Sequence, residues 1–343
     1  MTQKPFLEVK NLNVAFPTED GLVQASNDIT FSVARGETLA VVGESGSGKS
    51  VTSLAVMGLH DRKRTQISGE AILNLDSGPV DVISADEEAV RKLRGKAMSM
   101  IFQDPMSALH PYYSIGNQLI EAWSLYNEGD KAAGKKRAIE MLDLVGIPAA
   151  SKRVDEFPHQ FSGGMRQRVM IAMALINNPS LLIADEPTTA LDVTVQAQIL
   201  DLMRELQKQS NTAIILITHD LGVVAEMVDR VLVMYAGRAI EVAKVESIFE
   251  SPNHPYTKGL LSAVRSLDTE VHAKLETIPG SPPSLLNIPQ GCSFNPRCSF
   301  KNWVGKKCET EKPELHQIGS NFSACHLSNE DVKRMNNEEL PVS

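Results

Sequence analysis

The sequence has no long run of apolar residues. Its longest apolar runs, such as 213–217 and 39–42, are far shorter than the roughly 20 residues that a helix needs to cross a bilayer. The first residues also lack the apolar segment of a secretory signal, which usually spans about 7 to 15 residues. We therefore expect a chain without a membrane span or an export signal, with the cytosol as its compartment.

An excess of positive charge is absent as well. The 343 residues include 34 Lys and Arg against 42 Asp and Glu, which gives a formal net charge of −8. Because affinity for nucleic acid comes mainly from neutralised phosphates, this balance argues against a nucleic-acid partner. The 42% hydrophobic and 22% charged residues are typical of a globular chain, and the length predicts about two domains.

Cysteine is scarce and confined to the C-terminal tail, at Cys292, Cys298, Cys308 and Cys325. The spacing C-x5-C-x9-C-x16-C differs from the paired C-x2-C of zinc ribbons. Four thiols in one short tail can bind a [4Fe–4S] cluster or zinc, and they can also be reduced thiols without a ligand. The adjacent His326 is either a substitute ligand or a surface residue.

The hydrophobic pattern predicts an α/β fold. Alternating residues at 7–16 and 29–33 predict antiparallel strands. Short apolar runs predict buried parallel strands at 38–42, 97–102, 181–184, 214–217 and 231–234, with helical patterns such as 51–59 and 193–209 between them. Strand signals vanish over 105–160, where 132–145 predicts a helix within a helical insertion. A helix at 256–264, a proline-rich linker from 278 and the cysteine tail complete the chain.

A phosphate-binding loop is predicted between the strand at 38–42 and the helix that follows it. The segment Gly43, Glu44, Ser45, Gly46, Ser47, Gly48, Lys49 and Ser50 fits G-x-x-x-x-G-K-[ST] in full. Its glycines let successive amides face inward, and the helix adds the positive end of its dipole. Lys49 would reach the β and γ phosphates, and Ser50 would bind Mg²⁺. An ordinary glycine-rich turn before a helix is the alternative.

Two carboxylates follow the apolar strand at 181–184. Asp185 is placed to hold Mg²⁺ through water, and Glu186 to act as general base on the attacking water. The carboxyl ends of parallel strands are where ligands bind in such sheets. Asp-Glu-Pro can also be a turn with a helix cap, but a second strand end beside a phosphate loop favours the catalytic interpretation.

The segment Phe161-Ser-Gly-Gly-Met165 upstream of Asp185 resembles the signature of the ATP-binding cassette transport ATPases, the ABC family. The usual Leu-Ser-Gly-Gly-Gln has Phe at its first position and Met at its fifth here. Ser162 and the amides of Gly163 and Gly164 would form a second anion site for a γ-phosphate presented by another subunit. A plain helix N-cap explains the serine but not both glycines.

Other positions match further elements of that family. The resemblance implies that Gln103 senses Mg²⁺ and water, that Ala190-Leu-Asp192 crosses a dimer interface, and that His219 contacts the γ-phosphate. A lone histidine after a strand is otherwise usually a surface residue. Phe16 either stacks on adenine or belongs to the core.

The resemblance is closer still to the D-type ATP-binding subunit of bacterial oligopeptide and dipeptide permeases, over essentially the whole chain. Its shared stretches include 163–173, His254-Pro-Tyr256 and 291–298. It implies a P-loop NTPase (RecA-like) core with an antiparallel β subdomain and an α-helical subdomain at about 104–176. The nucleotide-binding domain would be 1–255 and the cysteine-containing extension 256–343.

The function implied is ATP hydrolysis, with Mg²⁺, coupled to uptake of peptides. The implied partners are a second, F-type ATPase, two membrane permease subunits and an extracytoplasmic peptide-binding protein, which would place the chain peripherally at the cytoplasmic face of the bacterial inner membrane. Members of the subgroup carry a cluster in the tail, which favours [4Fe–4S] over zinc.

Three alternatives stay open for the substrate and the class. The same machinery can serve dipeptides or a metal chelate such as nickel. A soluble cassette ATPase acting on nucleic acid or ribosomes usually carries coiled coils or two cassettes, and neither occurs here. A P-loop kinase gives no reason for residues 162–164.

Overall fold

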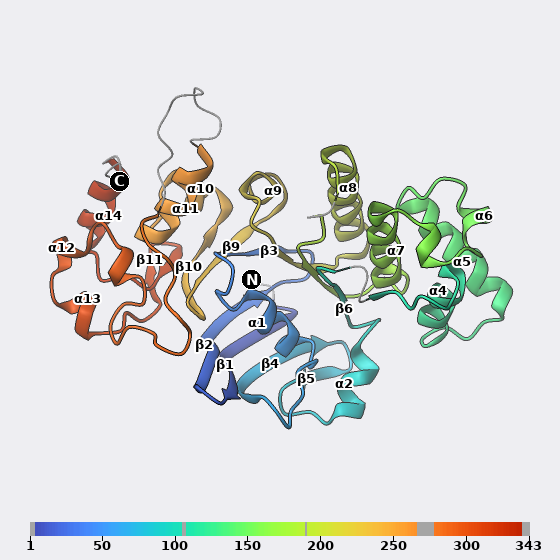
Figure 1. Cartoon of the computed structure of the whole chain (residues 1–343), viewed down its shortest axis with the longest axis horizontal. Helices are drawn as coiled ribbons and strands as arrows, with labels where there is room; N and C mark the ends of the chain where they lie inside the picture. Colours follow the sequence, from blue (N-terminus) through green and yellow to red (C-terminus); the bar gives the residue numbers. More distant parts are fainter. Residues whose placement is uncertain (1–3, 105–107, 189–190, 266–277, 338–343) are drawn as a thin grey trace.

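The fold is described by a computed structural model for residues 4–104, 108–188, 191–265 and 278–337. Two sheets form its centre (Figure 1). The first is antiparallel in the order β2-β1-β4-β5, and the second has eight strands in the order β11-β12-β10-β9-β3-β8-β7-β6. The phosphate loop follows β3, in the middle of the larger sheet.

The antiparallel sheet consists of β1 (Leu7–Thr18), β2 (Gly21–Val33), β4 (Gln66–Leu75) and β5 (Gly78–Asp81). The predicted strands at 7–16 and 29–33 are thus confirmed as an antiparallel pair, and the second is longer than expected. Strands β4 and β5 were not predicted. A short helix, α2 (Glu87–Leu93), follows this sheet and is capped by Asp86, whose side chain accepts from the Ala89 amide.

The parallel part of the larger sheet contains β3 (Thr38–Val42), β6 (Met98–Ile101), β7 (Leu181–Asp185), β8 (Ala213–Ile217) and β9 (Arg230–Tyr235). All five were predicted. Each is buried on both faces, because successive side chains point to opposite sides of a strand. In β3, Leu39 and Val41 join the core against the antiparallel sheet, whereas Ala40 and Val42 join the core beneath the helices.

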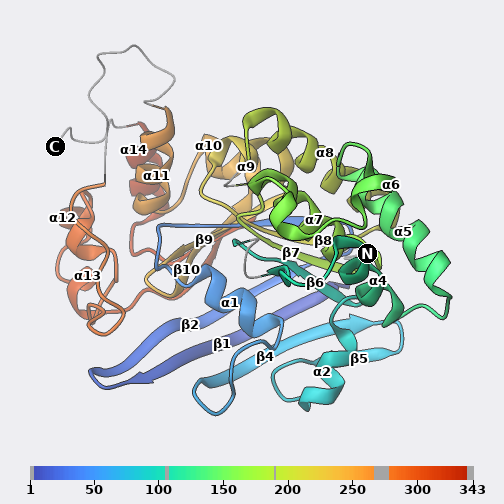
Figure 2. The same cartoon turned by 45° about the vertical axis from the view of Figure 1, so that its right-hand side comes forward.

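Helices cover the other face of this sheet (Figure 2). They include α8 (Val193–Ser210), α9 (Leu221–Met227) and α10 (Val245–Glu250). Helix α1 (Lys49–Val56) instead packs on the side of the antiparallel sheet, where Ala55 and Val56 belong to the core. The predicted helical insertion contains α4 (Ile115–Ser124), α5 (Lys131–Leu144), α6 (Ala150–Arg153), the short turn η1 (Pro158–Gln160) and α7 (Gly163–Leu175). No strand occurs over the described residues 108–160. The start of the predicted insertion at 105–107 lies outside the described residues.

The C-terminal extension lies on the side of the core opposite the helical insertion (Figure 1). It consists of α11 (Pro255–Arg265), η2 (Asn295–Arg297), α12 (Lys301–Val304), α13 (Lys307–Thr310), β11 (His316–Ile318), β12 (Asn321–Ser323) and α14 (Asn329–Asn337). β12 pairs with β10 (Arg238–Lys244), which pairs with β9. The extension thus continues the sheet of the core, although a boundary at residue 255 stays a prediction. None of the helices in the described ranges combines the length and the apolar character that a membrane crossing requires.

Candidate active site

The phosphate loop closes over a cavity of about 270 Å³ at the C-terminal end of β3. The cavity is lined by Gly43, Ser45, Gly46, Ser47, Gly48, Lys49, Ser50, Val51, Gln103, Glu186 and His219. Two glycines in this loop have no substitute. Gly48 has φ +98° and Gly43 φ +152°, and a Cβ would lie 2.2 Å from the Ala25 carbonyl oxygen at Gly48 and 2.2 Å from the Met234 carbonyl oxygen at Gly43. The neighbouring strands therefore hold the curve of the loop tightly.

Lys49 lies inside the curve of the loop. Its Nζ donates to the carbonyl oxygens of Gly43 and Glu44 at 2.7 and 2.9 Å. Burial lowers the pKa of the ammonium, and the nearby carboxylates of Glu186 and Asp185 oppose that shift. A desolvated cation at the centre of a ring of amides is suited to an anionic ligand.

Asp185 ends β7 beside the start of α1. Its carboxylate accepts a hydrogen bond from Ser50, which lowers its pKa, but burial has the larger effect and raises the pKa above the usual value. The two residues thus bring a hydroxyl and a buried carboxylate together. Mg²⁺ is commonly held by one or two protein oxygens together with waters and phosphates, so this pair fits that ion.

Glu186 stands at the centre of the polar side of the cavity. Its Oε2 accepts from Gln103 Nε2 at 3.0 Å, and its Oε1 lies 3.2 Å from His219 Nδ1. The residue has φ 48°, in the left-handed region, and its amide donates to the Ile217 carbonyl of β8 at 2.9 Å. Strained backbone of this kind persists where the surrounding structure fixes it, often at functional sites. Three predicted side chains from separate segments therefore contact one another, with the Glu186 carboxylate between Gln103 and His219.

The signature segment lies elsewhere. Ser162 caps α7, and its Oγ accepts from the Met165 amide at 3.3 Å. Neither Ser162 nor Gly163 nor Gly164 lines the cavity of its own chain. The helix is tied to the catalytic strand by Gln167, whose Nε2 donates to the Pro187 carbonyl at 2.7 Å.

Two other predicted positions have local partners. Asp192 caps α8 by accepting from the Val195 amide at 3.0 Å, while Ala190 lies outside the described residues. Phe16 packs edge-on against His60, with 5.5 Å between the ring centroids, and is not among the residues that line the cavity. The structure therefore does not bring Phe16 to the phosphate loop, and the adenine contact stays a prediction.

Comparison with known proteins identifies the family of this chain. The model of the ABC transporter family matches residues 26–189, and that of the oligopeptide/dipeptide transporter C-terminal region matches residues 240–304. An oligopeptide transport ATP-binding protein of Escherichia coli, OppD, is 54% identical over 95% of this chain and 94% of its own length. The chain belongs to the ABC transporter family. The OppD protein of Haemophilus influenzae is also 54% identical, over 86% of this chain and 90% of its own length.

Solved ABC proteins agree with the fold. A dimeric ATP-binding cassette in a post-hydrolysis state, bound to ADP and Pi, has a TM-score of 0.63 and 25% identity, over 70% of this chain and 98% of that one. The α/β P-loop NTPase fold predicted from the sequence is thereby confirmed.

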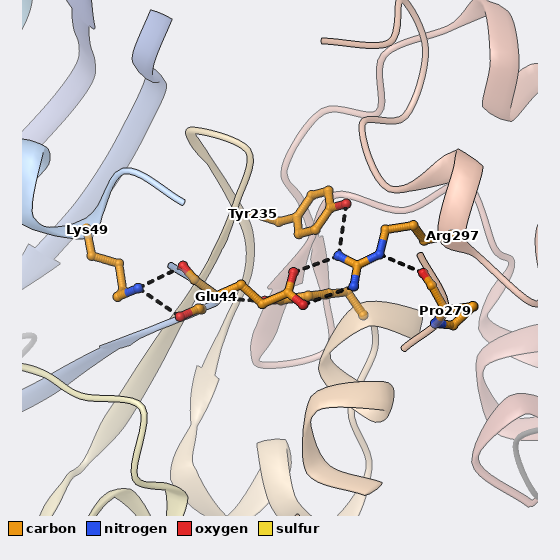
Figure 3. A network of polar contacts seen from close by, with 7 residues as sticks. Glu44, Lys49, Tyr235, Pro279 and Arg297 are labelled. Carbon is orange, nitrogen blue, oxygen red and sulfur yellow. Dashed lines mark hydrogen bonds and ion pairs between the residues drawn. The ribbon is translucent and has the colours of Figure 1, made fainter. Parts of the chain in front are cut away.

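One contact of this ABC chain was not predicted from its sequence. The Glu44 carboxylate, predicted as part of the phosphate cradle, turns away from the cavity toward Arg297 of the C-terminal extension (Figure 3). Arg297 donates to both carboxylate oxygens, at 2.6 and 3.0 Å. No pattern in the sequence links two residues so far apart, and only the position of Arg297 next to Cys298 marks it for attention.

The four cysteines of the extension gather without a disulfide. Burial raises the pKa of Cys298 to about 12, and the pKa of Cys325 is raised by burial and, to a lesser extent, by the other three thiols. In the described residues, however, no three Cys, His, Asp or Glu side chains are positioned to hold a metal ion. The thiols as placed thus do not form a finished cluster site, and His326 instead contacts the Glu311 carbonyl oxygen, at 2.8 Å from Nε2.

Proposed function

We propose that this chain is the ATP-hydrolysing subunit of an ABC importer that takes up oligopeptides across the cytoplasmic membrane. The observation that carries the proposal is that Lys49 and Glu186 line one cavity, with the Asp185 carboxylate bonded to Ser50 of the same cavity, in a chain with the C-terminal region of oligopeptide/dipeptide transporters. Two relatives with 54% identity are named for oligopeptide transport.

The phosphate loop would bind the triphosphate of ATP. The amides of 43–50 and the N-terminal end of α1 present partial positive charge, and Lys49 adds a full one. The Lys49 ammonium has three donors, and the carbonyls of Gly43 and Glu44 accept two of them, so the side chain can donate to a phosphate oxygen while both carbonyls hold it in place. The bond to phosphate would be the stronger one, because a phosphate oxygen carries charge and a carbonyl oxygen does not.

Hydrolysis would depend on Glu186. Its carboxylate accepts the proton of the attacking water, and Gln103 and His219 hold that carboxylate in place. Ser50, Asp185 and Gln103 would hold Mg²⁺, which supplies positive charge to the transferred phosphoryl group. Because burial raises the pKa of Asp185, a cation there would offset the cost of its ionised form.

A second ATPase subunit would complete the site. Residues 162–164 do not line the cavity of their own chain, so their serine hydroxyl and amides are available to the nucleotide of a partner. We therefore propose a heterodimer with an F-type subunit, in which each ATP lies between the phosphate loop of one chain and the signature of the other.

The membrane subunits would dock in an apolar groove between the core and the helical insertion. This groove of about 460 Å³ is lined by residues that include Phe102, Leu125, Tyr126 and Met173. Leu125 is 72% exposed, and Phe102 is next to Gln103 of the active site. A side chain of a membrane subunit inserted in this groove would therefore be displaced when Gln103 moves. Docking here would place the chain peripherally at the cytoplasmic face of the inner membrane.

For the extension we propose a [4Fe–4S] cluster, with the four cysteines as ligands. The donor set supports this, because four neighbouring free thiols match the ligands of such a cluster. The thiols would have to lose their protons and move together, since they do not form a metal site as placed. Iron and acid-labile sulfide, measured on protein purified without oxygen, test the proposal, and the absence of both elements contradicts it.

The transport assignment is tested by uptake. Cells with and without this chain are given labelled dipeptides, longer peptides and a nickel chelate. Loss of oligopeptide uptake on deletion is expected, along with recovery of integral membrane proteins and a peptide-binding protein when the tagged chain is purified. If deletion abolished only dipeptide or only nickel uptake, the transported solute would be reassigned. If deletion abolished no uptake, and the tagged chain was purified with ribosomes or DNA, the transport function would be refuted.

A further inference from the structure

The C-terminal extension contacts the phosphate loop through Glu44, which is an unspecified position of the loop motif. Three groups of Glu44 are bound at once. Its carbonyl accepts from Lys49 Nζ at 2.9 Å, its amide donates to the Tyr256 hydroxyl at 2.9 Å, and its carboxylate accepts from Arg297. Tyr256 belongs to α11 and Arg297 to η2, so two of the three anchors come from beyond residue 254. Figure 3 shows this chain of contacts from Lys49 to Arg297.

Arg297 is bound on every side. Its side chain is 5% exposed, and besides the bidentate pair with Glu44 its Nε donates to the Pro279 carbonyl at 2.9 Å and its Nη1 lies 3.4 Å from the Tyr235 hydroxyl. A guanidinium with this little solvent has to be paired. Only its planar fork of donors satisfies a carboxylate and a carbonyl at the same time.

The place of Arg297 is in turn fixed by the cysteine segment. The Asn295 amide donates to the Cys292 carbonyl at 2.9 Å, and the Cys298 amide donates to the Asn295 carbonyl at 3.2 Å. Within this turn Phe294 packs against Tyr235 and Tyr256, with ring centroids 5.3 and 5.4 Å apart. The packed aromatic rings therefore hold this segment in place, with Arg297 in contact with the phosphate loop.

We propose that Arg297 is a positioning residue for the phosphate loop: by holding Glu44, the C-terminal extension fixes the carbonyl to which Lys49 is bonded and raises the affinity of the loop for nucleotide. The inference rests on the proposed role of the loop in binding ATP. It adds that the extension, joined to the core by strand pairing, also acts on the nucleotide site. A change in the turn between Cys292 and Cys298 would reach Lys49 through two residues, Arg297 and Glu44.

The test compares the full-length chain with Arg297→Gln, Glu44→Gln and the double variant. The dissociation constant for Mg·ATP is measured by calorimetry, and the unfolding midpoint is measured separately. We expect each single variant to raise the constant by about tenfold, within the range usual for coupled sites. The dissociation constant of the double variant should not exceed that of the weaker-binding single variant, because both substitutions remove the same ion pair.

Arg334→Gln is the matched control. Arg334 lies in α14 of the same extension, over the Trp303 ring at 4.4 Å, whereas the bonds of Glu44 go to Lys49, Tyr256 and Arg297. It should lower the unfolding midpoint without changing the affinity. Native affinity in Arg297→Gln, even with a lower midpoint, would overturn the inference and leave the proposed function in place.

A second measurement uses the unmodified chain and is independent of how the variants fold. Because coupling is reciprocal, bound ATP must in turn steady the segment that holds Arg297. Amide hydrogen exchange over 292–298 should slow when Mg·ATP is added. Unchanged exchange with ATP bound overturns the inference alone, whereas a chain that binds no ATP overturns both the proposed function and the inference.

Discussion

Replacement of Glu186 by glutamine should separate ATP binding from ATP hydrolysis. The carboxylate contacts Gln103 Nε2 at 3.0 Å and His219 Nδ1 at 3.2 Å. A glutamine can direct its carbonyl to Gln103 and its amide to His219 when Nδ1 of the imidazole accepts. The glutamine side chain can therefore keep both of these contacts, while it removes the charge and the basicity of the carboxylate.

The expected size of the effect follows from the assigned role. A positioned general base contributes about 10²- to 10⁴-fold to a rate, which corresponds to roughly 3 to 5.5 kcal/mol of activation free energy. ATP affinity should stay the same or rise, because removal of a negative charge beside the cavity reduces repulsion of the phosphates.

The assay is single-turnover hydrolysis by the assembled complex, with nucleotide binding measured in parallel. Glu140→Gln serves as the control, because Glu140 lies on α5 in an exposed ion pair with Arg137 at 3.6 Å. A Glu186→Gln complex that hydrolyses ATP at the native rate would show that another group takes the proton. Weakened binding would instead assign Glu186 to the nucleotide pocket.

Three further predictions concern the loop and the buried core. Lys49→Ala should weaken nucleotide binding itself, and unchanged affinity in calorimetry would count against a phosphate contact. Gly48→Ala should abolish nucleotide binding and destabilise the fold, because its Cβ would lie 2.2 Å from the Ala25 carbonyl oxygen. In Gly46→Ala the Cβ would have no atom within 4 Å, so this variant should lose only the backbone strain energy of about 1 to 2 kcal/mol. Equal stability of the two variants in urea would refute this prediction. Burial raises the pKa of Glu241 to about 7, so its neutral form supports the fold below about pH 4.5 and that support is lost as the pH rises through 7. The unfolding free energy of Glu241→Gln minus that of the native chain should therefore increase by up to about 3 kcal/mol from about pH 4 to about pH 8. A decrease of this difference in urea titrations at the two pH values would contradict the prediction.

The sequence predicted those parts of the fold whose signal is local. Strand β3 ends at Val42, just before the first glycine of the loop, and α1 (Lys49–Val56) overlaps the helix predicted over 51–59. Strands β4 and β10 were missed. β4 has polar and glycine residues in its first half, and charged residues interrupt β10, so neither gives a long apolar run.

The active site was more predictable than its surroundings. Gln103, Glu186 and His219 each follow a parallel strand of the same sheet, and the carboxyl ends of such strands meet at one edge. The same rule does not extend to Phe16, because it lies on an antiparallel strand; the residue packs against His60, and its contact with adenine stays a prediction.

The contact between Glu44 and Arg297 explains why a complete motif still leaves part of a site undetermined. The pattern G-x-x-x-x-G-K-[ST] specifies the residues whose backbone or charge meets the phosphates and leaves the x positions free. At those positions a side chain can turn away from the ligand, as Glu44 does, and bind another part of the chain. In this chain the holding residue comes from the cysteine segment, so chemistry at Cys292 or Cys298 that displaced Arg297 would alter nucleotide binding without touching a residue of the motif.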